Sequence, residues 1–182
     1  TEKKEAFYEQ ISKEQNKDIH SVPQIYINNR YIGGHDEFMK FAAPKSEFLY
    51  DKLHEVSKVI TKNLNKIIDC NFYPTEKTKK SNFRHRPIGI GVQGLADVFA
   101  MLDIAYHSDE ARIVNRNIFE TIYHGALEAS NEIAKAKGSY ETFEGSPTSK
   151  GILQFDMWNI NPVKRYDWNA LKAKIKATGL RN

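Results

Sequence analysis

The chain has 182 residues, of which 40% are hydrophobic, and a net charge of +4, so it holds enough apolar material for one ordinary core. Its single cysteine, Cys70, excludes an internal disulfide framework and fits a reducing compartment, so we expect a cytoplasmic protein. Because no apolar run approaches about 18 residues and no charged-then-apolar start is visible, we expect neither a membrane span nor a secretory signal.

The first 42 residues predict short helices and a hairpin. Phe7 and Ile11 lie one turn apart within residues 2–15, which favours a helix. In SVPQIYINNRYIGGHDEF, residues 21–38, isoleucines alternate along a first strand, two asparagines suit the positive φ of a tight turn, and Tyr31 begins a return strand. A further helix is expected from Asp36.

The rest of the chain is predicted to be mostly helical and to follow a short junction. We place the junction at residues 43–46, because Pro44 stops a helix and its neighbours are small or polar. Periodicity and capping residues then predict helices over residues 47–69, over residues 109–137 between Ser108 and Gly138, and from Asp167 to Gly179.

The segment SNFRHRPIGIGVQGLA, residues 81–96, has the glycine spacing of a dinucleotide-binding loop, but its surroundings argue against one. Pro87 cannot donate to a sheet ladder and leaves only Ile88–Val92 as a short strand. The acidic residue at the right distance, Asp109, begins a helix instead of ending a second strand. We therefore expect the glycines to let a neighbouring element approach the backbone closely; they are Gly89, Gly91 and Gly94.

Four further patterns are interpreted as structural or as carrying no chemistry. A basic run around Phe83 lacks a repeated stacking platform, so we expect a solvated loop and no nucleic acid; the run is Lys77, Lys79, Lys80, Arg84 and Arg86. The six histidines show no HExxH motif and no cysteine partner at zinc-ligand spacing, so no metal site is expected. Glu120 and His124, four residues apart on a predicted helix, are interpreted as a structural pair, and Ser146 and Ser149 lack a nucleophile elbow.

Three longer segments occur in the order of a known family: HRPIGIGVQGLADVF at 85–99, NIFETIYHGALEAS at 117–130 and YETFEGSPTSKGILQFDMW at 140–158. They resemble the large, catalytic chain of class I ribonucleotide reductases, over about residues 47–182. The resemblance implies an α/β, helix-dominated fold, in which this segment supplies helices and a short strand to the wall of a ten-stranded α/β barrel. A segment of such a barrel is expected to expose one face of several helices and to leave strand edges unpaired.

The resemblance also implies an activity that these residues do not perform alone. Such enzymes reduce ribonucleotides through a protein thiyl radical that a metal-containing small subunit supplies, with ATP and dNTPs as effectors and thioredoxin or glutaredoxin as reductant. The family's reactive cysteines lie outside this segment, and Cys70 matches none of them, so we expect no catalytic residue and no bound cofactor here. The implied partners are the remaining parts of the large chain, the small subunit and a second large chain.

Residues 1–42 resemble the second half of a glutaredoxin, which implies a partial thioredoxin-like fold. In that family a cis proline frees the backbone of the residue before it to pair with glutathione, and a later turn receives a carboxylate at a helix N-terminus. The residues that would contact glutathione are Val22, Pro23, Gly34, His35 and Asp36. The half that carries the nucleophilic cysteine is missing, so thiol exchange is not expected. The alternative function is a non-catalytic glutathione-binding module.

Both resemblances are interrupted where reactive residues belong. The sequence is compatible with a natural fragment, with a fusion, and with pieces of a longer polypeptide that carries a whole glutaredoxin and a whole reductase domain. An intact mass near 21.0 kDa favours the fragment, and a mass several times larger favours the longer polypeptide.

Overall fold

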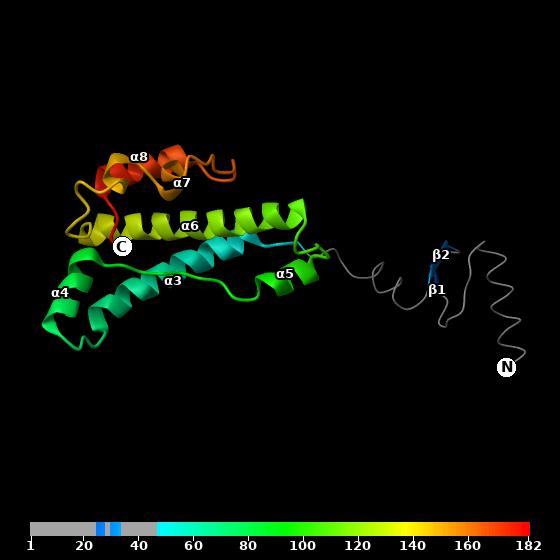
Figure 1. Cartoon of the computed structure of the whole chain (residues 1–182), viewed down its shortest axis with the longest axis horizontal. Coiled ribbons are helices and arrows are strands. Elements are labelled where there is room, and N and C mark those ends of the chain that lie inside the picture. The colour runs from blue at the N-terminus through cyan, green and yellow to red at the C-terminus, as the bar shows by residue number, and fades with distance from the viewer. Residues whose placement is uncertain (1–24, 28–29, 34–46) are drawn as a thin grey trace, which may run out of the picture. The chain divides into compact units, whose positions relative to one another are not determined.

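The computed structural model describes residues 25–27, 30–33 and 47–182, and the chain divides into two units, residues 1–47 and 48–182 (Figure 1). In the first unit, strand β1 (Ile25–Ile27) pairs antiparallel with strand β2 (Arg30–Gly33), with Tyr26 opposite Tyr31. This pairing confirms the two predicted strands of the hairpin.

Other predictions for the first unit lie outside the described residues. These are the helices at residues 2–15 and from Asp36, the asparagine turn at residues 28–29, and the junction at residues 43–46.

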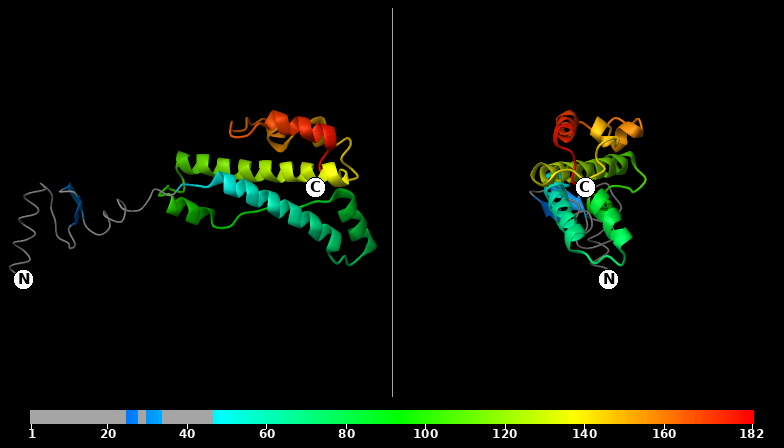
Figure 2. Two further views of the ribbon diagram at one scale, coloured as in Figure 1. Left: turned by 180° about the vertical axis from the view of Figure 1, so that it is seen from behind. Right: turned by 90° about the vertical axis from the view of Figure 1, so that its left-hand side faces the viewer.

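The second unit contains helices arranged in three layers, with the longest helix in the middle. In chain order they are α3 (Tyr50–Cys70), α4 (Glu76–His85), α5 (Leu95–Met101), α6 (Asp109–Lys137), the 3-10 turn η1 (Thr148–Lys150), α7 (Gln154–Met157) and α8 (Trp168–Thr178). Helix α3 lies along one side of α6, while α7 and α8 lie on the opposite side (Figure 2).

The sequence defines the ends of α6 and α8 as predicted. The Ser108 hydroxyl accepts a hydrogen bond from a backbone N–H of the first turn of α6, and Gly138 ends that helix with φ 81°. The Asp167 carboxylate caps α8 in the same way, and Gly179 follows its last turn with φ 78°. Both glycines adopt a positive φ that side chains with a Cβ rarely tolerate.

Helix α3 buries polar residues and exposes much of its apolar stripe. Ser57, Thr61 and Asn65 are buried, and the first two hydroxyls donate to carbonyls one turn earlier, so that they remain satisfied. On the same helix Val56 is 41% exposed and Ile67 49% exposed. The expectation that helix faces are left exposed is therefore confirmed for α3, whereas residues 47–182 contain no strand whose edge could be unpaired.

Gly125 of α6 lets α3 and α6 approach closely. A Cβ atom at this position would lie 2.9 Å from the His54 carbonyl oxygen and 3.1 Å from the Ser57 Cβ atom. Contacts this short require the helices to shift apart, so the absence of a side chain at residue 125 sets their separation.

An apolar core lies between α8 and the face of α6 opposite α3. Its buried members are Phe143, Leu153, Trp168, Leu171, Ile175 and Leu180. Tyr123 and Leu127 of α6 pack against them. The Asn131 amide of α6 also donates to the Gly179 carbonyl at 2.8 Å, which fixes the end of α8 on α6.

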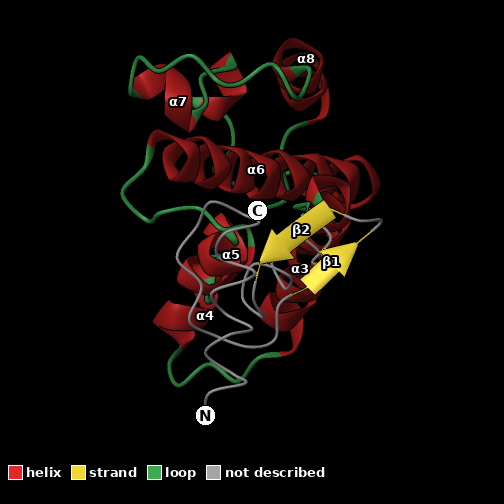
Figure 3. Ribbon diagram, turned by 90° about the vertical axis from the view of Figure 1, so that its right-hand side faces the viewer, coloured by secondary structure: helices red, strands yellow, loops and turns green. Residues whose placement is uncertain are grey.

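The prediction of an α/β barrel segment is wrong for residues 47–182, which are helical with irregular connections and contain no strand (Figure 3). The predicted strand at Ile88–Val92 is irregular chain between α4 and α5. Pro87 cannot donate to a ladder, and no other strand is described in this unit to pair with it. A Cβ atom at Gly89 or Gly91 would meet nothing within 4 Å, so the expected close approach of a neighbouring element is also wrong among the described residues.

The basic run forms a helix instead of the predicted loop. Helix α4 begins with a capping box, in which Thr75 and Thr78 each bond the backbone N–H of the other. The capping residues and the helix-forming lysines outweigh the repulsion between the positive charges. Arg86, the last member of the run, follows the helix in a left-handed conformation, with φ 46°.

We predict that Gly125→Ala destabilises the protein by about 1–3 kcal/mol, because the added methyl group overpacks the contact between α3 and α6. At a helix position with open space around it, the same substitution raises the free energy of unfolding by about 0.5–1 kcal/mol. The sign of the change therefore distinguishes a close helix contact from open space. Urea denaturation measures it, with Gly89→Ala as the control, since open space surrounds that glycine. Equal or higher stability of Gly125→Ala contradicts the close contact.

Candidate functional site

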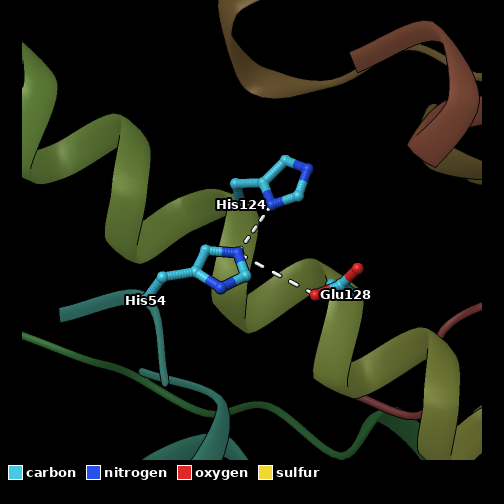
Figure 4. A group of neighbouring side chains, drawn as sticks. All are labelled: His54, His124 and Glu128. Carbon is cyan, nitrogen blue, oxygen red and sulfur yellow. Dashed lines mark hydrogen bonds and ion pairs between the residues drawn. The ribbon is translucent and has the colours of Figure 1, made fainter. Parts of the chain in front are cut away.

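The packing of α3 against α6 brings together two histidines and a carboxylate. His54 comes from α3, and His124 and Glu128 lie one turn apart on α6 (Figure 4). The His54 Nε2 atom lies 2.8 Å from His124 Nδ1 and 3.9 Å from Glu128 Oε2. Within the part of the chain that the structure describes, these three side chains form a group of potential metal ligands, with ligand atoms within 4.8 Å of one another.

Aromatic rings pack against both imidazoles. The Tyr166 ring stacks on His124, with centroids 4.3 Å apart and planes inclined by 16°, and also on His54 at 5.3 Å. The edge of Trp168 contacts His124 at 5.1 Å. The Tyr166 hydroxyl is itself fixed by a hydrogen bond to Thr121 Oγ1 at 2.9 Å. The positions of the two imidazoles therefore depend on the segment before α8 as well as on α3 and α6.

Lys58 places a positive charge beside the carboxylate of this group. Its Nζ atom lies 2.9 Å from Glu128 Oε2 and 2.5 Å from Glu132 Oε1, and Glu132 is also paired with Lys62 at 3.2 Å. Burial acts to raise the pKa of Glu128, but the hydrogen bond and charge of Lys58 outweigh it and hold that pKa below its ordinary value. Glu128 is therefore ionised at neutral pH.

His124 is a neutral imidazole at neutral pH. Burial, followed by the neighbouring His54, lowers the pKa of His124 to about 4, although Glu128 acts in the opposite direction. In the hydrogen bond between the two rings, one imidazole nitrogen donates and the other must be a free acceptor. The arrangement thus offers imidazole nitrogen atoms and an ionised carboxylate, which are ligand types for divalent transition metals.

Sequence reasoning missed this group. The pattern gave no reason to connect His54 with His124, which lie 70 residues apart, and the i, i+4 pair considered on α6 was Glu120 with His124. Glu120 does not contact His124: it pairs with Arg116 at 3.1 Å and accepts from the Val163 backbone N–H at 2.8 Å. The spacing of His124 and Glu128 on one face of a helix was the available signal.

The structure places the other sequence candidates away from this group or does not describe them. Val22, Pro23, Gly34, His35 and Asp36 lie outside the described residues, so the glutathione contacts stay a prediction. Cys70 is exposed at the end of α3. Ser146 and Ser149 bond one another within a local turn.

Arg86 is not part of a solvated basic surface. Its side chain is 2% exposed and donates to the Asn65 side-chain and main-chain oxygens at 2.8 and 3.0 Å, and it pairs with Asp69 at 2.9 Å. The Asn182 amide donates to the Arg86 carbonyl at 3.2 Å. Arg86 therefore ties α3 to the connection after α4 and to the end of the described chain.

An apolar pocket of about 430 Å³ lies beside the glycine-rich segment. It is lined by Pro87, Ile88, Ile90, Phe119, Ile122, Tyr123, Ala126, Leu127, Ser130 and Asn182. From this segment the pocket lining includes Pro87, Ile88 and Ile90 but none of the three glycines, and the mostly apolar lining does not resemble a phosphate site. In the described residues, no helix combines the length and apolar character needed to cross a membrane.

Comparison with known proteins identifies relatives over most of the chain. Residues 35–182 match the family described as "Ribonucleotide reductase, barrel domain". The chain is 57% identical over 136 residues to the ribonucleoside-diphosphate reductase large chain of Schizosaccharomyces pombe, which covers 75% of this chain and 17% of that protein. It is 56% identical over 143 residues to the ribonucleoside-diphosphate reductase large subunit of Caenorhabditis elegans, which covers 79% of this chain and 18% of that protein. It is 58% identical over 135 residues to the large subunit of Arabidopsis thaliana, which covers 74% of this chain and 16% of that protein. The chain thus spans less than a fifth of the length of these relatives.

We predict that Arg86→Ala destabilises the protein by about 1–3 kcal/mol, because it leaves the buried Asn65 oxygens without donors. The matched control is Arg84→Ala, which removes a solvent-exposed pair with Glu141 and should cost less than about 1 kcal/mol. Urea denaturation of both variants checks the difference. If the two substitutions cost the same, Arg86 does not have the buried structural role assigned to it.

Proposed function

Because the chain belongs to the ribonucleotide reductase family, we propose that residues 47–182 act as a segment of a ribonucleoside-diphosphate reductase large chain. In this role the segment contributes to the reduction of ribonucleoside diphosphates to deoxyribonucleotides. The observation that carries the proposal is the high sequence identity with large chains from a fungus, an animal and a plant.

In this proposal, residues 47–182 have a structural role in the large chain and contribute no reacting group. Its one cysteine, Cys70, is exposed at a helix end, and a disulfide cycle requires two thiols, so the reducing thiols must come from the remaining parts of the large chain. Residues 47–182 are therefore not expected to be catalytic on their own.

Exposed apolar side chains support a requirement for those remaining parts. Val59 is 56% exposed on α3, Ile113 59% on α6, and Trp158 65% after α7. Large apolar residues exposed on several elements indicate surfaces that other polypeptide covers. We assign that covering to the rest of the large chain.

The wider assembly follows from the same proposal. It includes a metal-containing small subunit that supplies the radical, a second large chain, thioredoxin or glutaredoxin as reductant, and ATP and dNTPs as effectors. The location assigned is the cytoplasm. No nucleic acid or membrane partner is included.

A chimaera tests the proposed function. Residues 47–182 replace the aligned segment of the Schizosaccharomyces pombe large chain, and reduction of a ribonucleoside diphosphate is measured with that organism's small subunit. We predict activity within about tenfold of the parent, equivalent to a barrier change below about 1.4 kcal/mol. A chimaera that folds and binds the small subunit, but shows no turnover, contradicts the proposal.

For residues 1–42 we propose a glutaredoxin-like segment that binds glutathione without thiol exchange. The antiparallel pairing of β1 with β2 supports it, because the resemblance requires a hairpin at this place. Glutathione would contact the backbone of Val22 and the turn Gly34, His35 and Asp36.

Titration calorimetry with glutathione tests this second proposal. We predict binding tighter than about 1 mM, which corresponds to about −4 kcal/mol, and its loss in Asp36→Ala. The neighbouring substitution Glu37→Ala is the matched control and should leave the affinity unchanged. Absence of binding heat, or equal losses in both variants, contradicts the proposed glutathione site.

A further inference from the structure

We propose that His54, His124 and Glu128 form a binding site for a divalent first-row transition metal ion, of which Zn²⁺ is the representative probe. The site joins α3 to α6. It follows from the convergence of two imidazole nitrogens and one carboxylate oxygen within 4.8 Å of one another.

The backbone brings the ligands together. Gly125 follows His124 directly and allows the His54 main chain to lie against α6, so that the two imidazoles meet across the helix contact. Glu128 lies one helical turn after His124, on the same face of α6. Pairs of ligands one turn apart on a helix are a common element of zinc sites, with a further ligand from another segment.

The distances fit a tetrahedral ion after small side-chain adjustments. Zinc–ligand distances of about 2.0–2.1 Å place two ligand atoms of a tetrahedral site about 3.3–3.4 Å apart. The observed separations from His54 Nε2 are 2.8 Å to His124 Nδ1 and 3.9 Å to Glu128 Oε2, one below and one above that spacing. Binding would require rotation of His54 and Glu128, whose side chains are 18% and 25% exposed, to bring both values toward that spacing.

Three protein ligands leave a fourth position for water. The partial exposure of His54 and Glu128 gives solvent access to the site, whereas His124 is 9% exposed and stacked on Tyr166. The buried histidine and the ring that orients it form the rigid side of the site, and the more exposed ligands form the side that adjusts.

Lys58 is the main competitor for the metal ion. Its ammonium group lies 2.9 Å from the same Glu128 oxygen that faces His54, so its charge opposes a cation there. Glu132 offers that ammonium group an alternative partner at 2.5 Å, which frees Glu128 to turn toward the metal. Removal of the Lys58 charge should therefore strengthen metal binding at Glu128.

Zinc titration of the 182-residue chain, followed by calorimetry, tests the site. We expect one Zn²⁺ per chain. Substitutions His54→Gln and Glu128→Gln should each weaken binding by more than the roughly tenfold effect of losing an outer-shell partner. Lys58→Met should tighten binding. As controls, His85→Gln and Cys70→Ser remove other exposed candidate ligands and should leave the affinity unchanged.

Two results overturn the proposal: no zinc binding by the wild-type chain below about 1 mM, or affinities of His54→Gln and Glu128→Gln equal to wild type. Circular dichroism without metal confirms that the variants fold. A measurement on the wild-type chain does not depend on variants at all: long-range ¹H–¹⁵N NMR spectra should show zinc-dependent shifts at His54 Nε2 and His124 Nδ1. Shifts confined to other histidines contradict the site.

Discussion

The close packing of α3 against α6 is the contact on which the second unit depends. It is made possible by Gly125, since a Cβ atom there would lie 2.9 Å from the His54 carbonyl oxygen. At this separation the side chains of α3 that face α6 must be small, and Ser57 and Thr61 meet that requirement. Their hydroxyls remain hydrogen-bonded to carbonyl groups of their own helix. The same contact brings His54 against His124 and Lys58 against Glu128.

The outer surfaces of this helix pair differ: one is covered and the other is largely exposed. One side of α6 is covered by the core under α8, with Trp168 and Ile175 buried. Much of the apolar stripe of α3 faces solvent, as does Ile113 of α6. The polar contact between α3 and α6 is hydrogen-bonded, while apolar faces on the outside stay exposed. Such exposed faces are consistent with a segment that matches only 17% of a longer relative.

Local sequence signals predicted the ends of helices well. They did not predict contacts between residues that are distant in the sequence. Ser108 and Gly138 delimit α6 through bonds and dihedral angles that depend only on neighbouring residues, and the hairpin strands follow from alternation in the same way. The strand expected at Ile88–Val92 is absent because a strand requires a pairing partner that local sequence cannot supply. The candidate metal ligands were missed for the related reason that His54 and His124 meet only through the fold.

The most direct test of this account is whether α3 and α6 touch at Gly125 in solution. Nuclear Overhauser spectra of the isotopically labelled chain can detect proximity between the α-protons of Gly125 and the β-protons of Ser57. We predict a strong cross-peak between them, because a Cβ atom at residue 125 would lie only 3.1 Å from the Ser57 Cβ atom. Absence of this cross-peak in a folded sample, with the rest of α3 and α6 assigned, would show that the helices do not pack as described.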